Sequence, residues 1–201
     1  MSSSRSLSEE EFKVLADTTF LLTKQEIDKK ISALLLDYQH ELAELHANNP
    51  TILPPTINAL PKKINKGQNY RGLPYWVVDF PSHFDKENIF TFRVVLWWGN
   101  YISASLIMCG NYFERAELDF VRVNNSGLSY SINSNPWLIE FEPKNLIPVK
   151  TTNLKQIKEH YENSKFVKLA VKYDLKQIEE LTTLCNQDFL GMLSMFNWRN
   201  I

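Results

Sequence analysis

Apolar residues in the first 50 positions recur at helical spacing and follow two helix-capping signals. Ser8 with Glu11, and Thr23 with Glu26, each fit a capping box, in which each side chain satisfies the other residue's free backbone N–H. The first pair predicts a short helix, and the second predicts a longer helix to about residue 47 with one buried face. The side chains expected to face inward are Phe12 and Leu15 in the short helix and Ile27, Ile31, Leu34, Leu35, Tyr38, Leu42 and Leu45 in the long one.

From residue 75 the period of the apolar positions changes to two, which is typical of half-buried strands. We predict strands over 75–80, 89–98, 102–109, 118–123, 128–132 and 137–142, then a helix over 153–163 and a strand over 165–173. Residues 111–117 are ambiguous and fit a helical turn. Lys168 and Lys172 on one face of 165–173 indicate a strand at a sheet edge, where charge discourages further pairing. A final helix is expected to begin at Asp174.

This order of elements predicts one α+β domain over residues 1–201. Residues 1–50 are helical, 51–74 form a proline-rich connector, 75–149 form the sheet, and 150–201 form a helix–strand–helix segment. Short turns between consecutive strands favour an antiparallel meander of about six to seven strands. The N-terminal and C-terminal helices are expected to pack against this sheet.

The least polar stretch of the chain, residues 94–110, reads VVLWWGNYISASLIMCG. It is shorter than the roughly 20 residues that a helix needs to cross a bilayer. It is also interrupted by Gly99-Asn100, a pair that favours turns. We therefore predict a β-hairpin here and no membrane span.

The register of this hairpin decides which side chains share a face. A two-residue loop at 99–100 would leave neither face consistently apolar, whereas a three-residue loop at 99–101 would gather the apolar residues on one face. Because a slip of one residue moves every side chain to the other face, burial selects strongly between the two registers. We predict the second register, with a core face made of Phe92, Val94, Leu96, Trp98, Ile102, Ala104, Leu106 and Met108.

The opposite face would then mix aromatic, charged and hydroxyl side chains with aliphatic ones, as ligand sites commonly do. The candidate ligand-binding residues are Tyr75, Asp79, Arg93, Trp97, Ser103 and Ser105 on the sheet, with Tyr70 and Arg71 at its rim. Arg93 would pair with an anionic group of the ligand, and the aromatic rings would pack on a flat apolar part. The alternative is a structural role, in which helices cover this face and Arg93 pairs with Asp79.

Composition and charge exclude some partners. The chain is 44% hydrophobic and 22% charged with a net charge of −1, so no global field draws it to nucleic acid or to an acidic membrane. Residues 61–72 are a local exception, because their basic side chains and tyrosine suit a phosphorylated ligand or single-stranded nucleic acid. The alternative is that these side chains are simply solvated. The two cysteines, Cys109 and Cys185, have no metal-type spacing, and the N-terminus has no signal-peptide pattern. We therefore expect a cytoplasmic location.

An enzyme is the second hypothesis. A hydrolytic site could be formed by Asp79, His83 and Asp85. These residues could bind a metal ion, or a carboxylate could orient the imidazole of His83 as a general base. The alternative is that a single histidine among turn-forming residues has no role beyond the loop itself. The chain contains no familiar nucleophile, phosphate-loop or dinucleotide motif. The sequence thus predicts no catalytic residue, no metal site and no cofactor.

Two short patterns carry a resemblance to a known family. Residues 69–75, NYRGLPY, followed by residues 96–100, LWWGN, resemble a family of small uncharacterised bacterial proteins. The resemblance implies a stand-alone intracellular protein and no particular activity, cofactor or site residue. We expect a binding protein for a small, anionic molecule, while a homodimeric interaction module is a third hypothesis.

Overall fold

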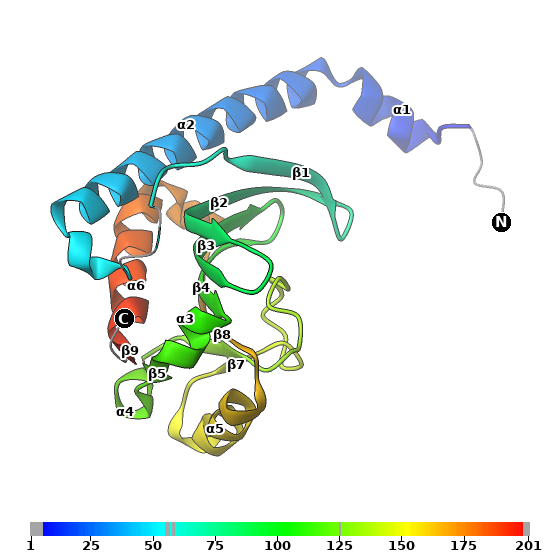
Figure 1. The fold of residues 1–201 in the computed structure, drawn as a ribbon. Coiled ribbons are helices and arrows are strands. Elements are labelled where there is room, and N and C mark those ends of the chain that lie inside the picture. Colours follow the sequence, from blue (N-terminus) through cyan, green and yellow to red (C-terminus); the bar gives the residue numbers. More distant parts are fainter. Residues whose placement is uncertain (1–5, 55–56, 58, 125, 199–201) are drawn as a thin grey trace. The chain divides into compact units, whose positions relative to one another are not determined.

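A computed structural model describes residues 6–54, 57, 59–124 and 126–198. The chain divides into two compact units, Met1–Asp37 and Tyr38–Ile201. Each unit is described by itself, and Figure 1 gives the labels of the elements. Among the described residues, no helix combines the length and the apolar character needed to cross a membrane.

The first unit consists of helix α1 (Glu9–Ala16) and the beginning of helix α2 (Thr18–Asn48). The predicted capping box at the start of α1 is confirmed, since the Ser8 backbone N donates to Glu11 and the Glu11 backbone N donates to the Ser8 hydroxyl. The second predicted cap is wrong. The long helix begins at Thr18, where the Asp17 carboxylate accepts a hydrogen bond from the backbone N of Phe20. The inward orientation predicted for residues 12 and 15 is also wrong, because α1 contains no buried residue.

The second unit contains a seven-stranded antiparallel sheet, which confirms the predicted α+β class. Its strand order is β1-β2-β3-β4-β8-β6-β7. The first four strands form a meander, and β8 follows β4 in the sheet although it lies much later in the chain. The strands are β1 (Asn65–Tyr70), β2 (Leu73–Phe84), β3 (Ile89–Trp97), β4 (Tyr101–Cys109), β6 (Ser129–Ser131), β7 (Leu146–Pro148) and β8 (Phe166–Tyr173).

Other elements surround this sheet. Strands β5 (Ala116–Leu118) and β9 (Phe196–Trp198) form a separate two-stranded sheet. The helices are α3 (Asn111–Arg115), α4 (Phe120–Val123), α5 (Leu154–Asn163) and α6 (Leu181–Ser194), and short 3₁₀ turns cover Pro50–Ile52, Thr151–Asn153 and Leu175–Glu180. The ambiguous segment after β4 is thus mainly helical, and the strand predicted over 118–123 is wrong beyond Leu118.

The hairpin of β3 and β4 confirms the predicted faces but not the predicted loop. Val94 lies opposite Ala104 and Arg93 lies opposite Ser105, so the apolar residues do share one face. The loop is 98–100 and not 99–101, because Trp97 pairs with Tyr101. A shift of two residues keeps every side chain on its face, which is why the facial pattern alone could not separate these two loops.

The apolar face of the sheet packs against α6. The Phe92 and Phe189 rings lie 5.2 Å apart, and both side chains are fully buried. The part of α2 that belongs to this unit adds Tyr38 and Leu42, which are also fully buried. Figure 1 shows α6 on one side of the sheet, while the connection between β6 and β7 lies on the other side.

Two further predictions about the sheet are wrong. The connector contains a strand, β1, which pairs with β2 and forms one edge of the sheet. Strand β8, predicted at an edge, lies between β4 and β6, and Lys168 on it is only 3% exposed. A lysine on a strand is therefore no proof of an edge when another segment covers that face.

Candidate functional site

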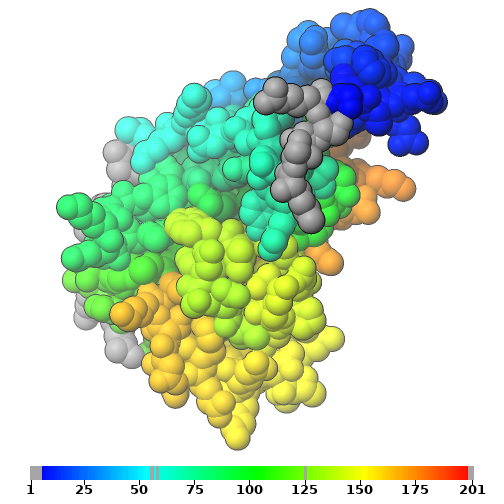
Figure 2. Space-filling model, turned by 90° about the vertical axis from the view of Figure 1, so that its right-hand side faces the viewer, coloured from blue at the N-terminus to red at the C-terminus, as the bar shows by residue number. Residues whose placement is uncertain are grey.

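The sheet face predicted to bind a ligand is largely covered by the β6–β7 loop, residues 132–145. Ile139 of this loop packs on Val77, Val95 and Trp97, and the partly buried rings of Tyr70, Tyr75 and Tyr101 surround this cluster. In the space-filling view, the yellow-green atoms of the loop lie beside the teal atoms of β1 (Figure 2). The middle of the face is therefore a second, smaller core.

The loop takes the place of the strand predicted over 137–142, which is wrong. Its backbone groups are satisfied mainly by side chains and not by a neighbouring strand. Tyr101 donates its hydroxyl to the Ile139 carbonyl at 3.0 Å and accepts the Phe141 backbone N–H at 3.3 Å. Lys168 donates its ammonium to the carbonyls of Pro136 at 2.9 Å and Leu138 at 2.5 Å. An alternating sequence forms no strand where side chains meet the hydrogen-bonding needs of its backbone.

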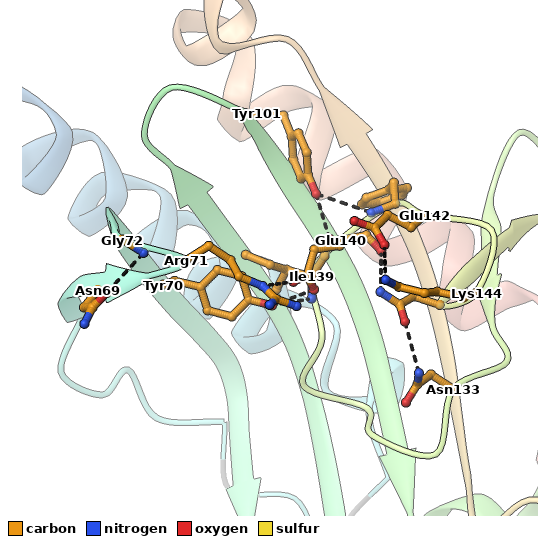
Figure 3. Close-up of polar contacts among 12 residues, drawn as sticks. Asn69, Tyr70, Arg71, Gly72, Tyr101, Asn133, Ile139, Glu140, Glu142 and Lys144 are labelled. Atoms are coloured by element: carbon orange, nitrogen blue, oxygen red, sulfur yellow. Dashed lines mark hydrogen bonds and ion pairs between the residues drawn. The ribbon is translucent and has the colours of Figure 1, made fainter. Parts of the chain in front are cut away.

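Glu140 fastens the same loop to the edge strand (Figure 3). Its carboxylate accepts the Tyr70 hydroxyl at 2.6 Å and the Arg71 Nε–H at 2.8 Å. Burial works to raise the pKa of Glu140, but the hydrogen bonds from Tyr70 and Arg71 outweigh it, and the net shift is downward. Burial, together with the hydrogen bond to Glu140, raises the pKa of Tyr70 to about 12. Tyr70 and Arg71, predicted at the rim of a ligand site, thus hold the loop in place.

Asp79 and Arg93 form a closed ion pair on this face. The Arg93 Nε and Nη2 donate to the two carboxylate oxygens of Asp79 at 2.7 and 2.8 Å, and the Thr91 hydroxyl donates to the same carboxylate at 3.0 Å. The guanidinium also lies over the Trp137 ring, 4.4 Å from its centroid. Arg93 is thus paired with Asp79, as the structural alternative expected, although a loop and not a helix covers this part of the face. The charge of Arg93 is neutralised by Asp79.

The remaining predicted residues lie inside the protein. Trp97 is 7% exposed, and its ring contacts Tyr70 and Tyr101 edge to face. Ser103 and Ser105 are both 5% exposed on β4. Tyr75 is half-buried beside the cluster around Ile139. The structure brings these side chains to one face, as predicted, but of the candidate residues on this face only Asp79 lines one of the cavities described next.

A cavity of about 450 Å³ lies beside the last residues of β2, and we call it the Lys63 pocket. Its lining residues are Lys62, Lys63, Asn65, Asp79, Ser82 and Phe84. Lys62 donates to the Ser82 backbone carbonyl at 2.6 Å. The Ser82 side chain is 3% exposed, and its Oγ has no hydrogen-bond partner among the residues that the structure describes.

An irregularity in β2 positions Ser82 at this pocket. Asp79 lies opposite Arg93 and Ser82 opposite Thr91, so β2 carries one extra residue between these pairs. Pro81, which has no backbone N–H, lies within this bulge, a position where proline is tolerated in a sheet. The strand predicted over 75–80 is longer than expected, since β2 continues to Phe84 and the turn follows it.

A second cavity, of about 300 Å³, contains two of the three residues of the enzyme hypothesis. His83 and Asp85 line it, and the His83 Nε2 lies 3.4 Å from the Asp85 carboxylate. Backbone hydrogen bonds from Glu87 and Asn88 lower the pKa of Asp85 to about 2. Asp79 lines the Lys63 pocket instead, and the described residues hold no group of three or more side chains suited to a metal ion.

Sequence reasoning missed several residues that shape this region. Lys62 and Lys63 belong to the basic segment that was noted, but Ser82 and Phe84 carried no signal beyond their place on β2. Lys168 and Glu140 resembled ordinary surface charges in alternating segments. Their burial depends on the β6–β7 loop crossing the sheet, and no local pattern in the sequence encodes that crossing.

No protein-family model, no curated protein and no solved structure matches the chain. The resemblance carried by residues 69–75 and 96–100 stays a prediction. The site is therefore described from its residues alone. It is a pocket lined by two lysines at the end of a sheet face, beside the neutral ion pair of Asp79 and Arg93.

Proposed function

We propose that the protein binds a small anionic molecule in the Lys63 pocket. The observation that carries the proposal is the Ser82 Oγ, a buried hydroxyl that has no hydrogen-bond partner among the described residues and belongs to a residue that lines a cavity together with two lysines. Buried polar groups are normally hydrogen-bonded, so a ligand oxygen is a natural partner for this hydroxyl. The proposal keeps the expected ligand class but moves the anion from Arg93 to Lys62 and Lys63.

The charge balance of the pocket supports an anion. Among the described residues that line the pocket, Asp79 is the only acidic one, and Arg93 neutralises it through two hydrogen bonds. The two lysines therefore leave a net positive charge at the mouth of the cavity. Asn65 and Ser82 can add neutral hydrogen bonds, as in sites that combine a few polar groups with an apolar wall.

The ring of Phe84 supplies that wall. Its centroid lies 6.0 Å from the centroid of the Trp137 ring, and Arg93 covers the same Trp137 ring. A ligand with a flat apolar part would contact Phe84 while its anionic end meets the lysines. We therefore expect a molecule such as an aryl phosphate or an aryl carboxylate to bind more tightly than a bare inorganic anion.

Isothermal titration calorimetry of the full chain with phenyl phosphate tests this function. Ser82→Ala is expected to weaken binding about fivefold, since one hydrogen bond contributes about 1 kcal/mol. Lys63→Ala is expected to weaken it about tenfold and to reduce its dependence on salt. Lys155→Ala is the matched control, because that side chain is 90% exposed on α5.

Inorganic phosphate and phenol serve as the two halves of the probe. We expect phosphate to bind more weakly than phenyl phosphate, and phenol to give no measurable heat. Absence of binding by phenyl phosphate would contradict the proposal. So would equal weakening by Lys63→Ala and Lys155→Ala, because binding would then depend on overall charge and not on this pocket.

A further inference from the structure

The two-helix arm, residues 6–37, exposes an unusual number of large apolar side chains. They are Leu7, Phe12, Val14, Leu15, Phe20, Leu21, Leu22, Ile27 and Leu36. Among the described residues from 38 onward, the exposed large apolar side chains are Leu60, Leu73, Phe84, Val121 and Leu190. Single exposed apolar residues are normal on a protein surface, whereas a contiguous group of them marks an interaction site.

Part of this surface is concave. A groove of about 470 Å³ lies on the arm and is lined by Leu7, Glu10, Glu11, Val14, Leu15 and Leu21. These residues come from α1, from the residue before its cap and from the first turn of α2. The helix α1 buries none of its own residues. Its capped, amphipathic sequence is therefore available to pack against another surface.

We propose that this groove pairs with the same groove of a second copy of the chain, giving a two-fold symmetric dimer. An isologous interface has to be self-complementary, since each residue meets its counterpart region on the partner. The arm meets this requirement. It carries Glu9 and Glu10 on α1 and Lys30 on α2, and none of these three forms an ion pair among the described residues.

Antiparallel packing of two arms would place the acidic start of one α1 beside the basic middle of the partner's α2. Both charge pairs would form at once because the two-fold axis repeats them. The other two lysines of α2 are already engaged, Lys24 with Asp28 at 3.1 Å and Lys29 with Glu26 at 2.6 Å. Lys30 is therefore the α2 lysine that is left to meet an acidic partner, while Lys13 lies on α1 itself, in its last turn.

The size of the surface also fits a second copy. A stable interface buries about 800 Å² on each partner. The arm offers nine large apolar side chains that are each at least 39% exposed, of which Leu15 at 61% and Phe12 at 57% are the most exposed. A lipid surface fits less well, because membrane-bound amphipathic helices are rich in Lys and Arg. Residues 6–37 contain seven acidic and four basic side chains.

Sedimentation velocity of the full chain over a range of concentrations tests this dimer. We expect a reversible monomer–dimer equilibrium that Leu15→Glu and Leu21→Glu each weaken at least about tenfold. Val121→Glu is the matched control, because Val121 is 87% exposed in the other unit and its substitution should leave the equilibrium unchanged.

Charge reversal tests the orientation of the two copies. Glu10→Lys and Lys30→Glu are each expected to weaken the dimer about tenfold, and the double variant is expected to restore it. A wild-type chain that stays monomeric at every concentration would overturn the proposal. So would a monomer that binds phosphatidylserine vesicles, or a dimer that Leu15→Glu and Leu21→Glu leave intact. The dimer does not depend on the anion pocket, because the two sites share no residue.

Discussion

At the scale of single residues, Lys168 has the most unusual environment. It lies on a central strand beneath the β6–β7 loop, where it donates to two backbone carbonyls. Burial, reinforced by repulsion from Arg93, lowers the pKa of Lys168 to about 7. Burying an ammonium group is costly, and the two carbonyls together with Glu140 offset only part of that cost.

This environment predicts how stability depends on pH. The folded protein releases the Lys168 proton near pH 7, while the unfolded chain keeps it to about pH 10.4. The unfolded state thus binds more protons between these values, and the free energy of unfolding rises with pH there. We expect a rise of about 2 kcal/mol between pH 7 and pH 9, measured by urea denaturation.

Two variants isolate this effect. Lys168→Met is expected to abolish the rise, whereas Lys172→Met, on the same strand but exposed, is expected to keep it. Burial raises the pKa of Cys185 to about 12, which opposes the rise near pH 9 equally in both variants. An unchanged slope in Lys168→Met would show that another group titrates.

At the scale of elements, the β6–β7 loop decides how the sheet face is used. It has no strand partner along residues 137–142, and side chains from β1, β4 and β8 hold it. The base of the loop closes through Asn133 and Asn145, whose side chains are hydrogen-bonded at 3.0 Å. The loop therefore behaves as a covering element of the sheet.

Glu140 is expected to be the main polar anchor of this loop. Glu140→Ala should lower the free energy of unfolding by about 2 kcal/mol, because it leaves the Tyr70 hydroxyl without its hydrogen-bond acceptor and removes a buried, paired charge. Glu142→Ala is the control on the same loop. Its carboxylate is 51% exposed and pairs with exposed Lys144, so its removal should change stability by less than about 0.5 kcal/mol.

Urea denaturation gives both free energies, and hydrogen exchange of residues 133–145 shows where the change occurs. We expect faster exchange throughout this segment in Glu140→Ala and unchanged exchange in Glu142→Ala. Equal effects of the two substitutions would mean that the apolar contact of Ile139, and not the anchor at Glu140, holds the loop.

At the scale of the whole molecule, the two proposed sites lie in different units. The groove belongs to the unit that ends at Asp37, and the Lys63 pocket belongs to the unit that begins at Tyr38. We therefore expect Leu15→Glu to leave the dissociation constant of phenyl phosphate unchanged, and Ser82→Ala to leave the dimer unchanged. Titration calorimetry and sedimentation on the same two variants measure both. A change in either cross-measurement would reveal coupling between the sites.

The sequence by itself determined the elements whose signals are local. The Ser8–Glu11 cap, the strands β2 to β4 and the division of Arg93 and Val94 onto opposite faces follow from spacing along the chain. The α+β class followed from the same periodicities. The sequence also brought Tyr75, Asp79, Arg93 and Trp97 to one face, because alternation along paired strands fixes that face wherever the other one is buried.

Only the tertiary structure decided what this face does. Periodicity reports which side chains are apolar, but not which segment will cover them. Residues 137–142 have the alternation of a strand, yet they cross the sheet because Tyr101 and Lys168 satisfy their backbone carbonyls. The same crossing buries Lys168 in the middle of the sheet. These contacts join residues that are far apart in the chain, so no local sequence pattern predicts them.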